Sequence, residues 1–530
     1  MKFNYSAQKL VGREKRLQRF FEILPGATSL AILIGMTVLS FRMPFAAAVM
    51  IIAFDLYWLL RLFYMTLFLI LSYILLHAEK ETDWMKDIRA LEERDAPRIS
   101  NQFRRKEVRR LLEKEAPIPP YESIRHLVII PVAKETEEII EPGIQSFLKQ
   151  VFPREKMLVV LAVEERASAE VRQSAQRMAD KYKNNFLDFL LVLHPDGLPG
   201  EARVKGANAT YAARAAAAYF QKKGISFDHV IASCFDADTV VSPQYFACLT
   251  YHFMACPDRI RASFQPIPVY HNNIWEAPGF ARVLEMGSSF FLLIEATNTE
   301  KLVTFSSHSI SFRALSDVGY WPVDMISDDS AIFWKAFIHF DGDYQTVPMY
   351  VTVSMDMNTA KTTWKTARNI YKQRRRWAWG VENFPLVVRA FLRADKISWY
   401  DRVRHAFKLF EGHVAWATWA FLLTFIGWIP AFYSAKRFSN SVLYYSSPRI
   451  TGIIFNLSFL SFIISIALSL LLLPKKKTKY PLLKRVGFAC EWLQVPFIAA
   501  FLSALPAMDA QIRMMLGKYL TFQVTEKHRK

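Results

Sequence analysis

Hydrophobic side chains are concentrated near the two ends of the chain and leave a long central stretch of mixed polarity. Ile23–Phe41 is an uncharged apolar run of about the length that crosses a bilayer, and Pro44–Leu76 is a second run with two charged residues. Three further runs, His413–Tyr433, Ile450–Leu473 and about Gly487–Ala507, lie in the C-terminal third. This pattern predicts membrane helices on both sides of a soluble domain.

Two of the apolar runs leave more than one arrangement open. At 1.5 Å per residue, Pro44–Leu76 is roughly 50 Å long, so it is either one helix that extends into the cytosol or two shorter elements. The last run contains Pro496, and a full crossing would separate the basic tail from the other basic segments. A re-entrant hairpin or a shallow pair of helices is therefore favoured. No small-residue cleavage site accompanies the first run, so we expect an anchor and not a signal peptide.

The charge distribution predicts the orientation of these helices. The chain carries a net charge of +19, and Lys and Arg gather in residues 2–19, 80–114 and 475–485. Because such clusters stay on the cytoplasmic side, we expect a multi-pass protein of the plasma or inner membrane with a cytosolic soluble domain and contacts to membrane lipids. No basic stripe is interleaved with aromatic residues, so no nucleic-acid partner is expected. Four cysteines without paired spacing argue against disulfides and zinc.

The soluble region alternates between short apolar runs and helical patterns. Such alternation predicts an open, mostly parallel α/β sheet, in which ligands bind at the carboxyl ends of the strands. The predicted strands are His126–Pro131, Met157–Val163, Phe189–Leu193 and His229–Ser233, and the clearest helices are Thr136–Val151 and Ala167–Tyr182.

Three motifs in this region carry candidate chemistry. Asp236 and Asp238 follow the fourth strand and would hold a hard divalent cation, although solvated acidic turns are also common. Asp328 and Asp329 precede an apolar helical pattern, where an acid either caps the helix or acts as a general base. Gln373–Trp377 reads QRRRW, which on its own is also typical of a basic, aromatic patch at a membrane surface.

In this order the motifs resemble those of the membrane-integrated family 2 glycosyltransferases, which include cellulose and hyaluronan synthases. The resemblance implies a GT-A nucleotide-sugar-binding domain inserted between N- and C-terminal membrane helices, with amphipathic interfacial helices. The implied divisions are a basic cytosolic N-terminus at 1–22, membrane helices at 23–77, a basic linker at 78–120, the GT-A domain at 121–378, interfacial helices at 379–411, membrane segments at 412–508 and a cytosolic tail at 509–530.

The resemblance also implies roles for the acidic residues. Asp238 would coordinate Mg²⁺ or Mn²⁺ on the donor diphosphate, and Asp236 would support it or contact the ribose. Asp329 would be the general base, with Asp328 as its neighbour. Lys205, in the string VKGAN, resembles the basic residue beside the donor phosphates, and a solvated loop lysine is the alternative.

The remaining implied roles fall on the QRRRW string and on the tail. Gln373 and Arg376 would contact the donor diphosphate, and Trp377 would present its ring to the acceptor sugar. Residues 522–527 read FQVTEK, which resembles the FxVTxK gating loop of cellulose synthases. Thr525 and Lys527 would then touch the nucleotide.

Two departures from the family pattern concern substrate recognition. The acid after the second strand, usually an aspartate at the uracil-ribose end of the donor, is Glu164 here, and Glu165 is its rival. The small-residue acceptor segment is Phe305–Ser309, with serine in place of a glycine. Within it, His308 either contacts the acceptor or is a hydrogen-bonded structural histidine.

We therefore expect an inverting, metal-dependent enzyme that transfers a sugar from a nucleotide sugar, expected to be a UDP-sugar, to a growing polysaccharide and secretes the polymer through its own helices. The alternative is transfer of one sugar to a lipid, because QxxRW also occurs in ceramide glucosylating enzymes. A transporter or a basic membrane scaffold would leave the ordered motifs unexplained.

Overall fold

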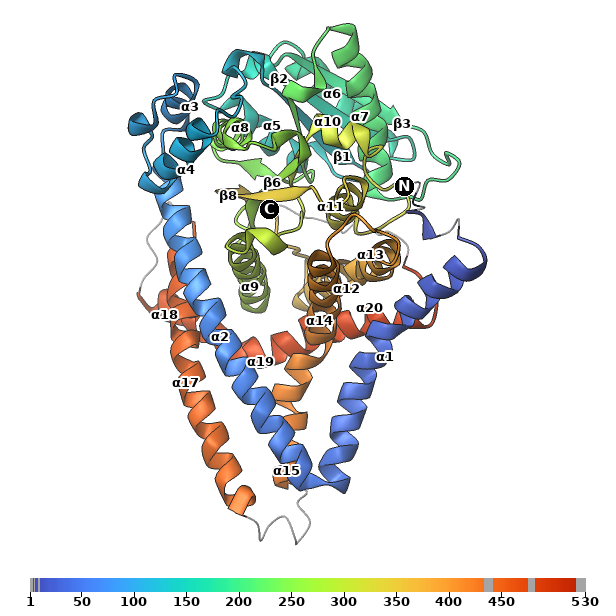
Figure 1. Ribbon diagram of the computed structural model, residues 1–530, viewed down its shortest axis with the longest axis vertical. Helices are drawn as coiled ribbons and strands as arrows, with labels where there is room; N and C mark the ends of the chain where they lie inside the picture. Colours follow the sequence, from blue (N-terminus) through green and yellow to red (C-terminus); the bar gives the residue numbers. More distant parts are fainter. Residues whose placement is uncertain (1–2, 4, 8–9, 433–441, 475–481, 521–530) are drawn as a thin grey trace.

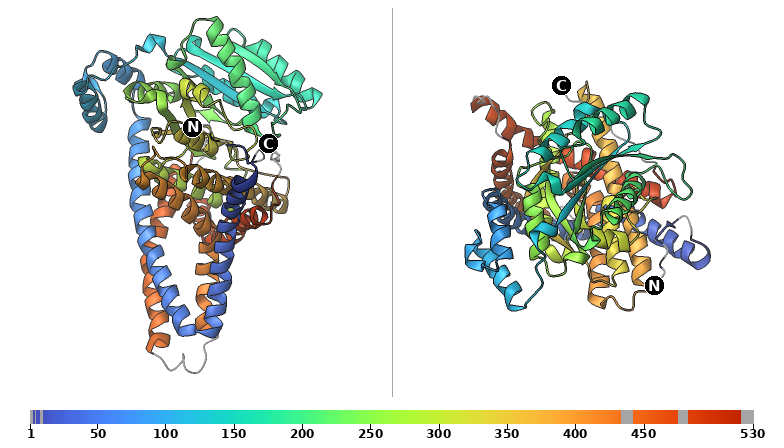
Figure 2. Two further views of the ribbon diagram at one scale, coloured as in Figure 1. Left: turned by 45° about the vertical axis from the view of Figure 1, so that its right-hand side comes forward. Right: turned by 90° about the horizontal axis from the view of Figure 1, so that it is seen from above.

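The protein consists of an α/β domain that stands on long apolar helices (Figure 1). The computed structural model describes residues 1–530 apart from 1–2, 4, 8–9, 433–441, 475–481 and 521–530. Thr525 and Lys527, which the sequence suggested as nucleotide contacts, lie outside the described residues. Figure 2 shows the same two parts from the side and from above.

The α/β domain is built on one eight-stranded sheet with the strand order β3-β2-β1-β4-β7-β6-β8-β5. Neighbours β3-β2-β1-β4 are parallel, as are β6 and β8, whereas β7 runs antiparallel to both β4 and β6. Strand β5 pairs antiparallel with β8 at one edge. The strands are β1 (Arg125–Val132), β2 (Met157–Glu164), β3 (Asp188–His194), β4 (Val230–Cys234), β5 (Val240–Val241), β6 (Ala262–Val269), β7 (Ser309–Ser311) and β8 (Gln345–Ser354).

Both faces of the central strands are covered by helices. Alternate side chains of β1 and β2 enter two separate apolar clusters, so that Val128 and Val159 pack on one face and Ile129 and Val160 on the other. This explains why these strands read as unbroken apolar runs in the sequence. The helices of the domain are α5 (Glu137–Leu148), α6 (Ala169–Tyr182), α7 (Lys205–Lys222), α8 (Tyr245–Ala255), α9 (Gly279–Ala296), α10 (Phe312–Asp317), α11 (Asp328–His339), α12 (Thr363–Ala378) and α13 (Asn383–Phe391).

The four strands and two helices that the sequence predicted are confirmed, with boundaries that shift by up to three residues. A mostly parallel α/β sheet set between N- and C-terminal apolar helices is likewise what the structure contains, as expected for the GT-A class.

The apolar runs form long helices below the domain. Within the described part of the chain, four helices are long and apolar enough to cross a membrane, or five if a bent pair counts as one span. They include α1 (Gly12–Arg42) and α2 (Pro44–Lys80), which are joined at Met43, and residues Arg449–Leu472 of α17 (Val442–Leu472). Of the two arrangements open for Pro44–Leu76, the structure has the single long helix.

One prediction about the C-terminal third needs correction. The sequence suggested that interfacial helices occupy 379–411 and that a separate apolar run begins at His413. The structure has one continuous helix, α14 (Trp399–Thr424), followed by a bend of 43° into a segment ending with α15 (Ile429–Phe432). The charged residues near position 410 do not break the helix, because Lys and Glu have high helix propensity.

The last apolar segment lies across the other long helices and not alongside them (Figure 1). It comprises α18 (Leu482–Cys490), α19 (Val495–Phe497), the π-helical turn η11 (Ile498–Ala504) and α20 (Leu505–Met515). Where α20 crosses α1, a Cβ atom on Gly26 would lie 2.9 Å from the carbonyl oxygen of Gln511, so this close approach requires glycine. Ser29 Oγ donates to Gln511 Oε1 at 2.7 Å at the same crossing.

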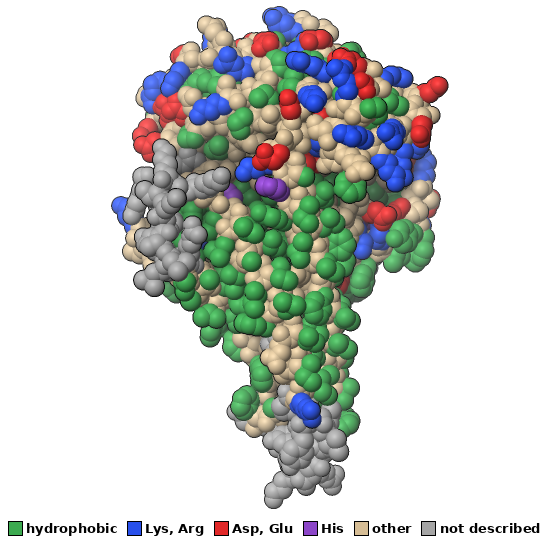
Figure 3. All heavy atoms as spheres, turned by 90° about the vertical axis from the view of Figure 1, so that its left-hand side faces the viewer, with side chains coloured by type: hydrophobic (Ala, Val, Ile, Leu, Met, Phe, Trp, Pro, Cys, Tyr) green, Lys and Arg blue, Asp and Glu red, His purple; other side chains and the backbone are tan. Residues whose placement is uncertain are grey.

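The surface reflects these two parts. In Figure 3 hydrophobic side chains cover the lower region formed by the long helices, and charged side chains cover the α/β domain. Helix α2 continues upward to α3 (Trp84–Glu92) and α4 (Gln102–Glu113). There the buried Arg104 lies 3.5 Å from Glu79 and 3.1 Å from Asp87, which ties the end of α2 to α3 and α4.

Candidate active site

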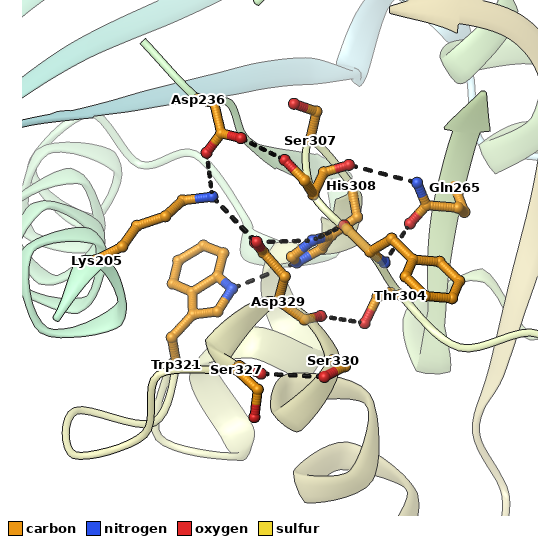
Figure 4. A network of polar contacts seen from close by, with 12 residues as sticks. Lys205, Asp236, Gln265, Thr304, Ser307, His308, Trp321, Ser327, Asp329 and Ser330 are labelled. Atoms are coloured by element: carbon orange, nitrogen blue, oxygen red, sulfur yellow. Dashed lines mark hydrogen bonds and ion pairs between the residues drawn. The ribbon is translucent and has the colours of Figure 1, made fainter. Parts of the chain in front are cut away.

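Two of the acids predicted from the sequence, Asp236 and Asp329, meet near the carboxyl end of β4 at one lysine, Lys205 (Figure 4). Asp236 lies just past β4, Asp329 lies in the first turn of α11, and Lys205 opens α7. Lys205 Nζ donates to Asp236 Oδ1 at 2.8 Å and to Asp329 Oδ1 at 3.0 Å. Burial disfavours the ammonium charge, but the two carboxylates outweigh it and hold the pKa of Lys205 well above its ordinary value. Lys205 is therefore a charged bridge and not a solvated loop residue.

Asp236 and Asp238 have different surroundings although they are two residues apart. Asp236 Oδ2 accepts a hydrogen bond from Ser306 Oγ at 2.5 Å. Asp238 is fully buried, and its Oδ2 accepts from the backbone N–H of Asp356 at 2.8 Å. Asn272 Nδ2 lies 2.9 Å from both the carbonyl oxygen of Asp238 and Asp356 Oδ1. The structure thus places another acid, Asp356, beside Asp238.

The donor set suits a divalent cation. Carboxylate oxygens are the ligands that Mg²⁺ and Mn²⁺ prefer, and Asp236, Asp238 and Asp356 supply them from two adjacent segments. Of these three acids, Asp236 also interacts with the charges of Lys205 and Arg376. The chemistry of these side chains therefore fits that of ligands to a divalent metal ion.

The two acids of α11 differ in accessibility. The side chain of Asp328 is 3% exposed, and burial, reinforced by the neighbouring Asp329, raises its pKa well above the ordinary value. The side chain of Asp329 is 24% exposed, and its backbone oxygen accepts from Thr304 Oγ1 at 2.6 Å. Asp329 is therefore the acid that a substrate can reach, whereas Asp328 is buried.

His308 is fully buried behind these acids. Its Nδ1 lies 2.9 Å from the carbonyl oxygen of Phe305, and its Nε2 accepts from Trp321 Nε1 at 3.3 Å. Burial lowers the pKa of the imidazole, which keeps it neutral. Of the two roles open for His308, the geometry favours the structural one, because both ring nitrogens are engaged and the side chain has no exposed surface.

Glu164 and Glu165 lie apart from the acids, in a small pocket at the ends of β2 and β3. Glu164 forms an ion pair with Arg166, and Glu165 Oε2 accepts from the backbone N–H of Asp196 at 3.0 Å. The pocket is also lined by residues 194–198 and 201–204, and the latter lead directly into Lys205. A ligand that spans the pocket and the acids would therefore pass the start of α7.

The three arginines of the QRRRW string point to three different partners. Arg374 Nη2 donates to the buried Glu285 of α9 at 2.8 Å, and its guanidinium lies 4.5 Å from the ring centre of Trp377. Arg375 Nη1 donates to Asp509 of α20 at 2.8 Å. For Arg376, burial lowers the pKa while the charges of Asp236, Asp328, Asp329 and Glu135 raise it, so this arginine faces the acids.

Trp377 and Gln373 complete the string. The Trp377 ring lies 6.2 Å from that of Tyr270, on which the charges of Asp236 and Asp238 act, so the aromatic pair adjoins the acidic site. Gln373 is largely buried. Several predicted residues therefore lie in one region at the carboxyl end of β4. They are Lys205, Asp236, Asp238, the two acids of α11, Arg376 and Trp377.

Sequence reasoning missed two acidic residues near this region. Asp356 follows β8 as an isolated acid with no motif around it, and the antiparallel pairing of β8 with β5 brings it to Asp238. Glu382 follows Trp377 closely but reads as one of several charges in an amphipathic stretch. Its side chain accepts hydrogen bonds from Ser327, next to the two acids of α11. The sequence around Asp356 and Glu382 contains no motif that would have marked them as site residues. The one available indication was that Asp356 follows a strand and Glu382 follows the QRRRW string.

An acidic, lysine-bridged site at the carboxyl ends of a largely parallel sheet defines a ligand-binding α/β domain. Residues 233–473 match the family model described as glycosyl transferase family group 2. This match agrees with the resemblance that the motifs predicted from the sequence, over this part of the chain.

Over 243 residues the chain is 26% identical to the poly-beta-1,6-N-acetyl-D-glucosamine synthase of Staphylococcus epidermidis. The aligned region covers 44% of this chain and 54% of that protein. The chain thus spans about half the length of the curated relatives it matches.

Two solved structures are also similar. The mannosyltransferase PcManGT of Pyrobaculum calidifontis, in complex with GDP-Man and Mn²⁺, has a TM-score of 0.40 at 14% identity and covers 85% of this chain and 100% of that one. S. aureus TarS 1–349, in complex with UDP-GlcNAc, has a TM-score of 0.34 at 13% identity and covers 64% of this chain and 90% of that one.

Proposed function

We propose that this protein is a metal-dependent, inverting glycosyltransferase that extends a polysaccharide from a nucleotide sugar, with UDP-sugars as the donors. The observation that carries the proposal is the bridge of Lys205 between Asp236 and Asp329. It unites the strand end that would hold the donor with the acid that would activate the acceptor.

Asp329 acts as the general base. It accepts the proton of an acceptor hydroxyl while that oxygen forms a bond to the anomeric carbon of the donor sugar. The bond from the same carbon to the diphosphate breaks on the opposite face, so a single displacement inverts the configuration. Asp329 suits this role because its side chain is partly exposed and its backbone is fixed by Thr304.

Lys205 and Arg376 stabilise the departing diphosphate. Both cations face the acids from different elements, and their charges are fixed before the reaction, which is the arrangement that favours charge developing in a transition state. Gln373 is proposed to contact the same diphosphate. A divalent ion held by Asp238 and Asp236, with Asp356 nearby, would supply Lewis-acid stabilisation of the leaving group. Mg²⁺ and Mn²⁺ are the proposed ions.

The remaining proposals concern recognition. Glu164 and Glu165 would contact the nucleoside from their pocket, and Trp377, beside Tyr270, would support the acceptor sugar through its ring. The similarity to a poly-beta-1,6-N-acetyl-D-glucosamine synthase favours a polysaccharide over a lipid acceptor and makes UDP-N-acetylglucosamine the first donor to test. Contact of Thr525 and Lys527 with the nucleotide is part of the same proposal.

The proposed setting is a multi-pass membrane protein with a cytosolic catalytic domain. The apolar helices and the basic flanks of 2–19 and 80–114 support it, as does the apolar surface of Figure 3. Secretion of the polymer between these helices, and the division of the chain at 121–378 for the catalytic domain, belong to the same proposal.

The test is nucleotide release by the full chain in detergent with a panel of UDP- and GDP-sugars and Mg²⁺ or Mn²⁺, followed by separation of the products by size. Transfer that is lost in Asp329→Asn but kept in Asp317→Asn, a matched change of an exposed acid, supports the proposal. A ladder of polymer indicates a synthase, and a single glycolipid indicates the lipid acceptor. Undiminished transfer by folded Asp329→Asn removes this residue from the mechanism.

A further inference from the structure

The segment that follows Trp377 forms hydrogen bonds with the residues at the start of α11. Trp377 lies near the end of α12, and the 3₁₀ turn η8 (Trp379–Glu382) leads from there into α13. Glu382 Oε1 accepts from the backbone N–H of Ser327 at 2.8 Å and from Ser327 Oγ at 2.7 Å. Its other oxygen accepts from Trp379 Nε1 at 3.0 Å. One carboxylate thus gathers three donors, two of them from the residue that precedes Asp328.

The next residue reinforces this contact. Asn383 Nδ2 lies 2.9 Å from Ser330 Oγ and 3.2 Å from Ser327 Oγ. Ser327 and Ser330 flank the two acids of α11 on either side. The side chains of two consecutive residues after the QRRRW string therefore bracket the turn that carries Asp329.

Ser327 is the N-cap residue of α11. A capping hydroxyl normally accepts a hydrogen bond from the first turn of its own helix. Here the hydroxyl of Ser327 donates to Glu382, 55 residues further along the chain. The direction in which α11 starts is consequently set from outside the helix, by the segment that also bears Trp377.

We propose that Glu382 is a positioning residue that fixes the distance between Asp329 and the ring of Trp377. This inference rests on the proposed function, since it assumes that Asp329 is the base and that Trp377 supports the acceptor. The two residues lie 48 positions apart and on different helices, and Glu382 connects them through Ser327 on one side and Trp379 on the other.

The chemistry of the contact requires a carboxylate. Three donors converge on Glu382, and above the pKa of about 7 to which burial raises this group its ionised carboxylate offers acceptors alone. Glutamine has the same shape, but its amide would set an N–H group against the donor of Trp379 or of Ser327. Glu382→Gln therefore keeps the packing while it disturbs the hydrogen bonds that orient α11.

The experiment compares Glu382→Gln, Ser327→Ala and the double variant with the unaltered full chain, using the donor that supports transfer. We expect Glu382→Gln to lower kcat by about 10- to 100-fold, because a misplacement of about 1 Å at the reacting groups has an effect of that size. The KM for the donor stays within about threefold, since the donor contacts are untouched. Ser327→Ala keeps the backbone donor and should have a smaller effect.

The double variant separates positioning from general stabilisation. If Glu382 acts through Ser327, the double variant loses no more kcat than Glu382→Gln alone. The matched control is Glu276→Gln, an exposed glutamate, which should leave kcat and the midpoint of thermal unfolding unchanged. Effects on kcat that multiply in the double variant, or a folded Glu382→Gln with kcat within twofold of the unaltered chain, overturn the inference.

Two further outcomes are also decisive. If Glu382→Gln does not fold, Ser327→Ala alone decides, because a lower kcat at constant donor KM supports the inference and an unchanged kcat overturns it. An unaltered protein that transfers no sugar from any donor refutes the proposed function itself, which is a different result from an active protein that tolerates Glu382→Gln.

Discussion

Replacement of Gly206 by alanine is the sharpest test of how the site is packed. Gly206 follows Lys205 in the first turn of α7. A Cβ atom at this position would lie 2.3 Å from the carbonyl oxygen of Pro322 and 2.9 Å from the Cβ of Asp328. The Pro322 oxygen belongs to the backbone and the Asp328 Cβ is bonded directly to it, so neither atom can move aside by a side-chain rotation. The backbone of α7 or of the segment before α11 must therefore move.

The geometry sets the size of the effect. Ordinary van der Waals contact of a Cβ atom begins near 3.4 Å. A separation of 2.3 Å between the added Cβ and the Pro322 oxygen therefore requires a displacement of about 1 Å. Overpacking of this kind costs about 1–3 kcal/mol in stability. Because the displaced segments carry Lys205 and Asp328, the same shift alters the distances from Lys205 to Asp236 and Asp329, and we expect sugar transfer to fall about 10- to 100-fold.

The assay is thermal unfolding of the detergent-solubilised chain together with the initial rate of nucleotide release. Gly287→Ala is the matched control, since Gly287 lies inside α9 and has open space around the position of a Cβ. That variant should keep its rate and gain up to about 1 kcal/mol from helix propensity. A Gly206→Ala variant with unchanged rate and unchanged unfolding midpoint would show that the close approach of α7 to Asp328 is not as described.

Three further predictions follow from individual contacts. Glu285→Ala should destabilise the protein by about 3–5 kcal/mol, because Arg374 is left buried without its carboxylate, and thermal unfolding against exposed Glu276→Ala measures this. Burial raises the pKa of Glu382 from 4.5 to about 7. The native protein therefore binds this proton more tightly than the unfolded chain does. The contribution of Glu382 to the free energy of unfolding consequently falls as the pH rises from 4.5 to about 7. Unfolding midpoints across this pH range should therefore slope less in Glu382→Gln, and equal slopes would contradict the assignment. Chelation of divalent ions should abolish transfer and added Mg²⁺ or Mn²⁺ should restore it, whereas Asp238→Asn should remain inactive at any ion concentration.

Local patterns in the sequence were sufficient for the first four strands, for two helices of the α/β domain and for the long apolar helices. The run from Leu127 to Ile130 predicted a buried strand because β-branched and aliphatic residues without polar interruption suit a strand covered on both faces. The position of Asp236 and Asp238 at a ligand-binding edge followed from that strand pattern alone. The antiparallel β7 between β4 and β6 was missed, since a three-residue strand leaves no periodicity to detect.

The sequence by itself determined where apolar helices, strands and the acidic and QRRRW motifs occur, because those features depend on neighbours within a few positions. Tertiary structure alone decided that Lys205 joins Asp236 to Asp329, that Asp356 stands beside Asp238, and that Glu382 holds the start of α11. These contacts join segments separated by 31 to 124 residues. Their formation depends on the order in which strands and helices pack, and no local periodicity records that order.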